Sequence, residues 1–179
     1  MKIKPTKSRN RVTVELGRTD PSLLAHAGGA ENFTLRRILV PLDFSKCSRH
    51  AVRYAVAFAR QFDASVTLLN VVPPFYQPGD FSGGIDYTAI EKDFEAGAQR
   101  ELEAVGRRLI GRSVTWQPQL RFGRPAEPIA KVASELNVDL IILSTRGHTG
   151  IKHVVFGSTA ENVVRHAPCP VLTLRAGEH

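Results

Sequence analysis

The sequence is poor in the features that mark membrane, secreted and metal-binding proteins. No apolar run approaches the ~20 residues needed to cross a bilayer, and the basic start lacks the apolar segment of a secretory signal. The two cysteines, Cys47 and Cys169, lie in no Cys-x-x-Cys pair and in no Cys/His cluster with metal-ligand spacing. We therefore expect two reduced thiols in a cytoplasmic protein that has no membrane partner.

Signatures of efficient catalysis are also missing. The chain has no Gly-x4-Gly-Lys-Ser/Thr loop, no nucleophile elbow with its Ser-His-Asp partners, and no His-Glu-x-x-His motif. Phosphoryl transfer needs a positioned nucleophile and charge clamps in addition to a binding site. The sequence therefore names no catalytic residue, and at most it leaves weak ATP hydrolysis open.

The net charge of +7 is distributed unevenly. Residues 1–37 hold eight Lys/Arg against three acids, whereas the rest of the chain holds sixteen against fourteen. We interpret residues 1–34 as a basic N-terminal extension, flexible or loosely docked, which precedes a domain over residues 35–176. A nucleic-acid partner would depend on this extension alone, so we do not expect one for the domain.

The domain alternates apolar strand patterns with amphipathic helix patterns. This alternation predicts a mainly parallel sheet with helices on both faces in a single α/β domain. Pro118 cannot donate to a strand ladder, so the strand that contains it should lie at an edge. The expected strands are 37–42, 65–72, 114–120, 138–143 and 171–174, and the expected helices are 45–62, 86–110, 125–136 and 158–166. We expect Ser45 to be the N-cap of the first helix and Asn137 to end the third helix in the left-handed conformation.

The helix over residues 86–110 should bury one apolar stripe against the sheet. Gly97 and Gly106 are expected to weaken it locally. The residues of the stripe are Ile90, Phe94, Ala98, Leu102, Val105 and Leu109.

Residues 138–161 form the most informative stretch. An apolar strand over residues 138–143 is followed by a loop with Gly147 and Gly150, and then by Gly157 and Ser158 at the start of a helix. Ser158 and Glu161 have capping-box spacing, which predicts Ser158 as the N-cap. A strand, a glycine loop and a helix N-terminus together can hold phosphate. The same features also begin many helices that bind nothing.

A family resemblance favours the phosphate interpretation. Gly147, nine intervening residues and then Gly157-Ser158 resemble the nucleotide loop of the universal stress protein family, as do residues 157–175 and 37–45. The resemblance covers roughly residues 36–175. It implies a five-stranded Rossmann-like sheet of order 3-2-1-4-5, similar to the adenine nucleotide alpha hydrolases. It further implies ATP as ligand, a regulatory role in stress response, and a homodimer formed through the last strand, Val171 to Leu174.

Strand order 3-2-1-4-5 reverses between the first and fourth strands, where open α/β sheets bind their ligands. We expect Asp43, at the end of the first strand, to face the ribose or a phosphate-bound Mg²⁺; the alternative is a structural Asp that caps the next helix. Val71 should offer its backbone to the adenine edge. Gly147, Gly157, Ser158 and Thr159 should hold the phosphates through backbone N–H groups and hydroxyls. The other expected cofactor-binding residues are Pro41, Leu42, Leu143, Ser144 and Arg146.

One residue departs from the family pattern. ATP-binding members generally have a glycine three residues before the position of Gly147, and here that residue is Ser144. Serine adopts fewer backbone conformations than glycine and its side chain fills space. This keeps open the alternative of a scaffold or chaperone-like stress protein that binds no nucleotide.

Overall fold

A computed structural model describes residues 2–5, 12–15, 34–74, 87–145 and 157–174. Its main sheet has five parallel strands: β3 (Arg37–Pro41), β4 (Ser65–Val72), β5 (Trp116–Phe122), β6 (Leu140–Ser144) and β7 (Val171–Leu174). Four helices connect them: α2 (Lys46–Phe62), α3 (Tyr87–Leu109), α4 (Ala126–Glu135) and α5 (Ser158–His166). The strand order is β5-β4-β3-β6-β7, which confirms the predicted order 3-2-1-4-5.

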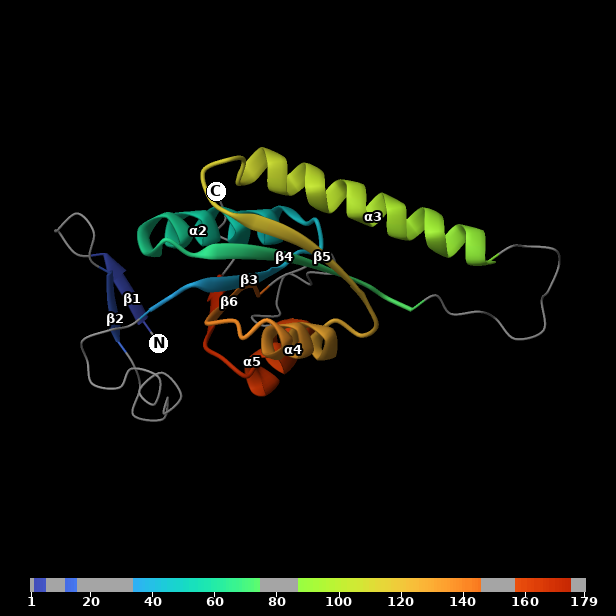
Figure 1. Cartoon of the computed structure of the whole chain (residues 1–179). Helices are drawn as coiled ribbons and strands as arrows, with labels where there is room; N and C mark the ends of the chain where they lie inside the picture. Colours follow the sequence, from blue (N-terminus) through green and yellow to red (C-terminus); the bar gives the residue numbers. More distant parts are fainter. Residues whose placement is uncertain (1, 6–11, 16–33, 75–86, 146–156, 175–179) are drawn as a thin grey trace.

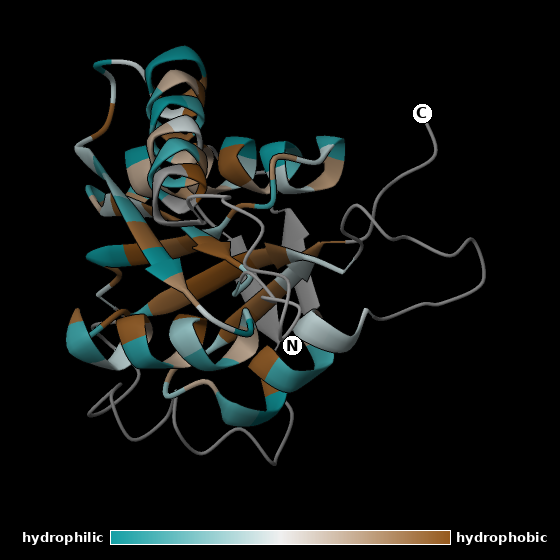
Figure 2. Cartoon of the chain, turned by 90° about the vertical axis from the view of Figure 1, so that its right-hand side faces the viewer, coloured by the Kyte–Doolittle hydropathy of each residue, from teal (hydrophilic) through white to brown (hydrophobic). Residues whose placement is uncertain are grey.

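The helices form two layers around the sheet. Figure 1 shows α2 and α3 on one face and α4 and α5 on the other. Successive residues of β3 point to opposite faces, so Ile38 and Val40 pack towards α2 while Leu39 packs towards α4 and α5. Figure 2 shows the hydrophobic strands enclosed between helices whose outer surfaces are hydrophilic. Burial on both faces explains why the strands read as continuous apolar runs.

Most element boundaries agree with the sequence to within two or three residues. Ser45 is the N-cap of α2, as expected, and its side chain accepts from the Ser48 N–H. Asn137 has φ 47° and ends α4 in the left-handed conformation. The third strand begins at Trp116, two residues later than predicted, and it lies at the sheet edge with Pro118 opposite Leu68.

The prediction of one buried stripe along α3 is wrong at its N-terminal half. Leu102 and Val105 are buried, but Phe94 is 58% exposed. In Figure 1 the N-terminal half of α3 extends past the end of the sheet, so the sheet covers only its C-terminal half. There Gly106 allows the ring of Trp116 to lie against the helix backbone, and Trp116 Nε1 donates to the Gly111 carbonyl.

A second, smaller sheet lies before β3 in the sequence. β1 (Lys2–Pro5) pairs antiparallel with β2 (Val12–Glu15), with Lys2 opposite Glu15. The sequence did not predict the pairing of these two segments. None of the described helices is long and apolar enough to cross a membrane.

Candidate functional site

A cavity of about 280 Å³ opens at the carboxyl ends of the central strands. This volume is close to the lower end of the roughly 300–1,000 Å³ typical of ligand pockets. The strand order reverses between β3 and β6, so the cavity lies at the predicted switch point. Its lining residues are Pro41, Leu42, Asp43, Ser48, Leu69, Val71, Pro125, Ile129, Leu143, Ser144, Thr145, Gly157, Ser158, Thr159 and Ala160.

Every expected site residue that the structure describes lines this cavity. Arg146 and Gly147 lie outside the described residues. Sequence reasoning missed Pro125 and Ile129, although the N-terminus of α4 follows β5 and therefore reaches the same sheet edge. It also missed Thr145, which directly follows a residue that was predicted. The remaining missed residues are Ser48, Leu69 and Ala160.

The N-terminus of α5 forms one wall, and its cap differs from the prediction. Gly157, not Ser158, is the N-cap, and no side chain caps this end. The capping box is therefore wrong, because Ser158 already lies in the first turn and Glu161 donates its N–H to the Gly157 carbonyl. The hydroxyls of the exposed Ser158 and Thr159 stand beside the first-turn N–H groups, which have no intrahelical partner.

The backbone of Gly157 does not serve as expected. Its N–H donates to the Thr145 carbonyl at 2.9 Å, so this donor is already used within the protein. A Cβ built on Gly157 would lie 3.2 Å from the same carbonyl oxygen. Glycine therefore lets the start of α5 approach the end of β6, and the first-turn N–H groups that remain for an anion begin at Ser158, which lines the cavity.

The charges along α5 suit an anion at its N-terminus. Glu161, in the first turn, pairs with Arg165 at 3.1 Å on the exposed side of the helix. Arg165 and His166 occupy the last turn, where positive charge complements the helix dipole. The partial positive charge of the N-terminus therefore faces the cavity beside two hydroxyls.

Ser144 is accommodated without unusual backbone geometry. It is the last residue of β6, paired with Leu174 of β7. Among the described residues, positive φ at a non-glycine position occurs at Phe44, Asp63 and Asn137, not at Ser144. The backbone at this position therefore does not require glycine, and what distinguishes this chain is a hydroxymethyl group in the cavity wall.

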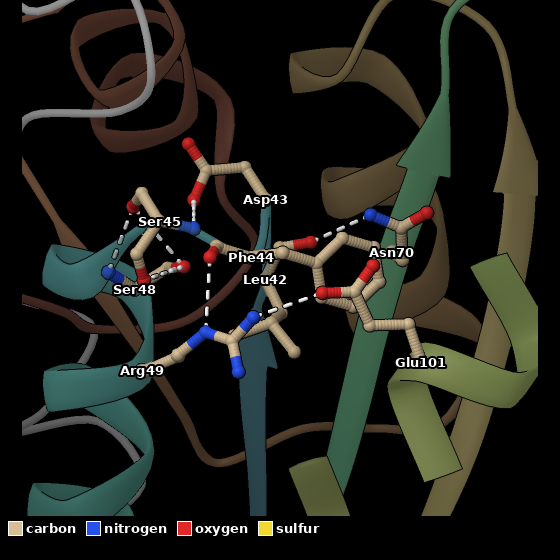
Figure 3. A network of polar contacts seen from close by, with 8 residues as sticks. All are labelled: Leu42, Asp43, Phe44, Ser45, Ser48, Arg49, Asn70 and Glu101. Atoms are coloured by element: carbon tan, nitrogen blue, oxygen red, sulfur yellow. Dashed lines mark hydrogen bonds and ion pairs between the residues drawn. The ribbon is translucent and has the colours of Figure 1, made fainter. Parts of the chain in front are cut away.

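The turn between β3 and α2, drawn in Figure 3, carries Asp43, which also lines the cavity. Asp43 Oδ1 accepts from the Ser45 N–H at 3.1 Å, an Asx turn. The Ser45 hydroxyl oxygen in turn accepts from the Ser48 N–H at 3.1 Å. Asp43 thus shapes the turn, as its structural interpretation predicted. It also lines the cavity, and contact with a ribose or with Mg²⁺ stays a prediction.

This turn is strained and firmly held. Phe44 has φ 62°, a conformation that is rare for a bulky residue and costs about 1–3 kcal/mol. Asn70 Nδ2 donates to the Leu42 carbonyl at 2.7 Å. Arg49 Nε donates to the Phe44 carbonyl at 3.0 Å, and Arg49 Nη2 pairs with Glu101 of α3 at 2.8 Å. Hydrogen bonds from β4 and α2 therefore offset the strain.

No group of three or more His, Cys, Asp or Glu side chains in the described ranges is arranged to hold a metal ion. Cys47 and Cys169 are both free thiols. Cys169 packs near β6, where burial, aided by the charge of Asp139, raises the pKa of its thiol to about 12. A thiol with so high a pKa is a poor nucleophile at neutral pH.

Comparison with known proteins agrees with this architecture. A family profile described as the universal stress protein family matches residues 34–175. The universal stress protein MJ0531 of Methanocaldococcus jannaschii is 32% identical over 143 residues, covering 78% of this chain and 82% of that protein. The solved structure of hypothetical protein MJ0577 superposes with a TM-score of 0.71 at 25% identity, covering 82% of this chain and 100% of the other.

Two further similar structures contain adenine nucleotides. A universal stress protein in complex with cAMP superposes with a TM-score of 0.59, covering 80% of this chain and 98% of that chain. A universal stress protein from Archaeoglobus fulgidus in complex with dAMP superposes with a TM-score of 0.56, covering 79% and 98%. Each is 21% identical to this chain, so both show the shared fold.

Proposed function

The chain belongs to the universal stress protein family, and we propose that it is a regulatory module of the stress response that binds an adenine nucleotide, with ATP as the expected ligand. The observation that carries the proposal is the wall of the cavity formed by the first turn of α5. Phosphates would accept hydrogen bonds from the backbone N–H groups that begin at Ser158 and from the hydroxyls of Ser158 and Thr159.

The rest of the cavity suits a nucleoside. Its inner lining is mostly apolar and includes Pro41, Val71 and Ile129, which offer a surface for a base. Asp43 lies at the carboxyl end of β3, where its carboxylate would accept from ribose hydroxyls. The same fold holds cAMP and dAMP in two family members. The cavity lining thus combines apolar residues with the hydroxyls of Ser158 and Thr159, a combination that supports the proposal of a nucleotide.

A phosphate-bound Mg²⁺ fits the same residues. Mg²⁺ is usually held by one or two carboxylates together with substrate phosphates and water. Asp43 is the carboxylate among the lining residues of the cavity, and Ser158 and Thr159 line the same cavity. Bound Mg²⁺ would neutralise phosphate charge. We assign no catalytic role to these residues.

The direct test is to denature the purified full-length chain and look for released adenine nucleotide by chromatography. Calorimetric titration with ATP, ADP, AMP and cAMP, each with and without Mg²⁺, then ranks the ligands. We expect saturable binding of at least one of them. Neither released nor titratable nucleotide would refute the proposal and favour the scaffold or chaperone-like alternative.

A charge placed at Ser158 separates binding from folding. An aspartate in the first turn of a helix is stabilising by roughly 0.3–1 kcal/mol, but it would repel a phosphate at the same place. We therefore expect Ser158→Asp to keep or raise the thermal midpoint and to weaken nucleotide binding by more than roughly tenfold, about 1.4 kcal/mol. Ser158→Asn is the matched control, since it has nearly the same shape without the charge. Equal affinities of the two variants would place the phosphates elsewhere.

We also propose that two copies pair through β7, whose four residues are all half-buried at the sheet edge. The carbonyls of Pro170 and Leu174 accept from the N–H groups of Ile141 and Thr145, so both face β6, and alternate residues such as Thr173 direct their backbone groups outwards. Thr173→Pro should therefore remove an outward N–H without breaking the ladder to β6. We expect light scattering to give a dimer for the unmodified chain and a monomer for this variant. A monomeric unmodified chain at micromolar concentration would exclude the dimer.

A further inference from the structure

The position of Asp43 depends on contacts that its neighbours make. Leu42 donates its N–H to the Leu69 carbonyl at 2.8 Å, and its own carbonyl accepts from Asn70 at 2.7 Å. On the other side, the carbonyl of Phe44 accepts from Arg49. Hydrogen bonds thus hold the residues before and after Asp43, and Asp43, whose Oδ1 accepts from the Ser45 N–H, lines the cavity.

Arg49 donates a hydrogen bond to the carbonyl of Phe44, the residue with the strained backbone. Phe44 has φ 62°, and such conformations persist only where the surroundings over-determine them. The guanidinium of Arg49 bonds the Phe44 carbonyl through Nε at 3.0 Å and the Glu101 carboxylate through Nη2 at 2.8 Å. Figure 3 shows Arg49 between the turn and α3, with Asp43 pointing away from it. Arg49 therefore acts on the turn and does not contact the carboxylate of Asp43.

We propose that Arg49, braced by Glu101 of α3, is a positioning residue for the nucleotide site and holds the β3–α2 turn so that Asp43 faces the ligand. This inference rests on the proposed nucleotide binding. Only arginine supplies two donors in one rigid plane, so lysine in its place would keep the charge but not both contacts. The Arg49–Glu101 ion pair also links the first turn of α2 to α3. No residue of α3 is among the lining residues of the cavity, so α3 would act on the site through this ion pair.

The test is a double-mutant cycle measured by calorimetric titration of the full-length chain with Mg-ATP. We expect Asp43→Ala and Arg49→Met each to weaken binding several-fold. The two losses should not add in the double variant, because Arg49 acts through Asp43. A purely structural role for Arg49 would instead add its loss to that of Asp43.

Matched variants separate position from charge and from folding. Arg53→Met, an exposed arginine one turn further along α2, should leave the affinity unchanged. Arg49→Lys should weaken binding despite its charge, which excludes simple attraction of phosphate. If Arg49→Met does not fold, Glu101→Gln at an exposed site of α3 still weakens the brace and should lower the affinity by a smaller factor.

The outcomes distinguish this inference from the proposed function. Absence of any nucleotide binding by the unmodified chain would overturn both. Binding by the unmodified chain that is unchanged in Arg49→Met, or losses that add in the cycle, would overturn only the role of Arg49. Reduced affinity in both Arg49 variants, together with non-additivity, would support it.

Discussion

The packing of Trp116 against Gly106 leads to a sharp prediction about stability. Gly106 is buried in α3, and a Cβ added there would overlap Cζ3 and Cη2 of the indole and lie 2.7 Å from Cε3. Carbon atoms in contact prefer about 3.5–4.0 Å. Gly106→Ala therefore forces the ring, or the helix and strand that hold it, to move apart.

The magnitude follows from three opposing contributions. Overpacking a well-packed site costs about 1–3 kcal/mol. Displacement of the ring also endangers the 3.1 Å hydrogen bond from Trp116 Nε1 to the Gly111 carbonyl, which contributes about 0.5–1.5 kcal/mol. The higher helix propensity of alanine stabilises the helix by about 1 kcal/mol and so offsets part of these two losses. We expect Gly106→Ala to destabilise the fold by about 1–3 kcal/mol, which lowers the thermal midpoint by roughly 2–12 °C.

Gly97 in the same helix is the matched control. The atom nearest to a Cβ added at Gly97 is Arg100 Nη2, at 4.0 Å, so the added methyl group meets no obstacle. Only the gain in helix propensity remains, and Gly97→Ala should stabilise the fold by up to about 1 kcal/mol. Thermal and urea unfolding followed by circular dichroism measure both variants. Trp116 is the single tryptophan of the chain, so its emission spectrum reports whether the ring moves in Gly106→Ala and stays in place in Gly97→Ala.

An equally stable Gly106→Ala variant with unchanged tryptophan emission would refute this reasoning. Trp116→Leu in the Gly106→Ala background provides the second check. Removing the ring removes the overlap, so the alanine should then be less harmful than it is beside tryptophan. If the alanine costs the same in both backgrounds, the cause lies in the helix and not in its contact with β5.

Two further predictions concern the buried Asn70 and the half-buried Cys169. Asn70→Asp replaces the donor to the Leu42 carbonyl with a carboxylate, so we expect a loss of about 1–3 kcal/mol in the free energy of unfolding by urea; an unchanged midpoint would contradict the role of this hydrogen bond. Burial raises the pKa of Cys169 from 9.0 to about 12, so the folded protein binds this proton more tightly than the unfolded chain does. Its stabilising contribution is therefore complete below pH 9 and is lost as the pH rises towards 12. A thiol reagent should label Cys169 more slowly in the folded protein than in urea, and equal labelling rates in the two states would contradict the raised pKa.

The sequence predicts those parts of the fold that depend on local pattern. Alternation of strand and helix patterns, the Ser45 cap and the left-handed Asn137 all depend on neighbouring residues, and all are found in the structure. The exposure of Phe94 was not predictable, because helical periodicity does not reveal how far a sheet extends beneath a helix. Gly106 reads as a weak point in the sequence, and only the position of Trp116 gives it a packing role.

The candidate site likewise has parts that the sequence predicts and parts that only the packed structure reveals. Residues at the ends of β3, β4 and β6 were placed correctly, because the carboxyl ends of parallel strands share one edge of the sheet. What the sequence does not reveal is which of their hydrogen-bonding groups the protein already uses. Gly157 was expected to direct its N–H at phosphate, yet that N–H holds the start of α5 to Thr145.

Thr145 shows why this bond matters for the cavity. It donates its N–H to the Leu174 carbonyl of β7 and accepts from Gly157, so it joins the end of β6 both to the edge strand and to the first turn of α5. These contacts are made by the protein alone. The donors that begin at Ser158 are therefore held in position before any ligand arrives, which lowers the ordering cost of binding. The glycine of the motif is needed here for a close backbone approach within the protein, and the anion would be bound by the residues that follow it.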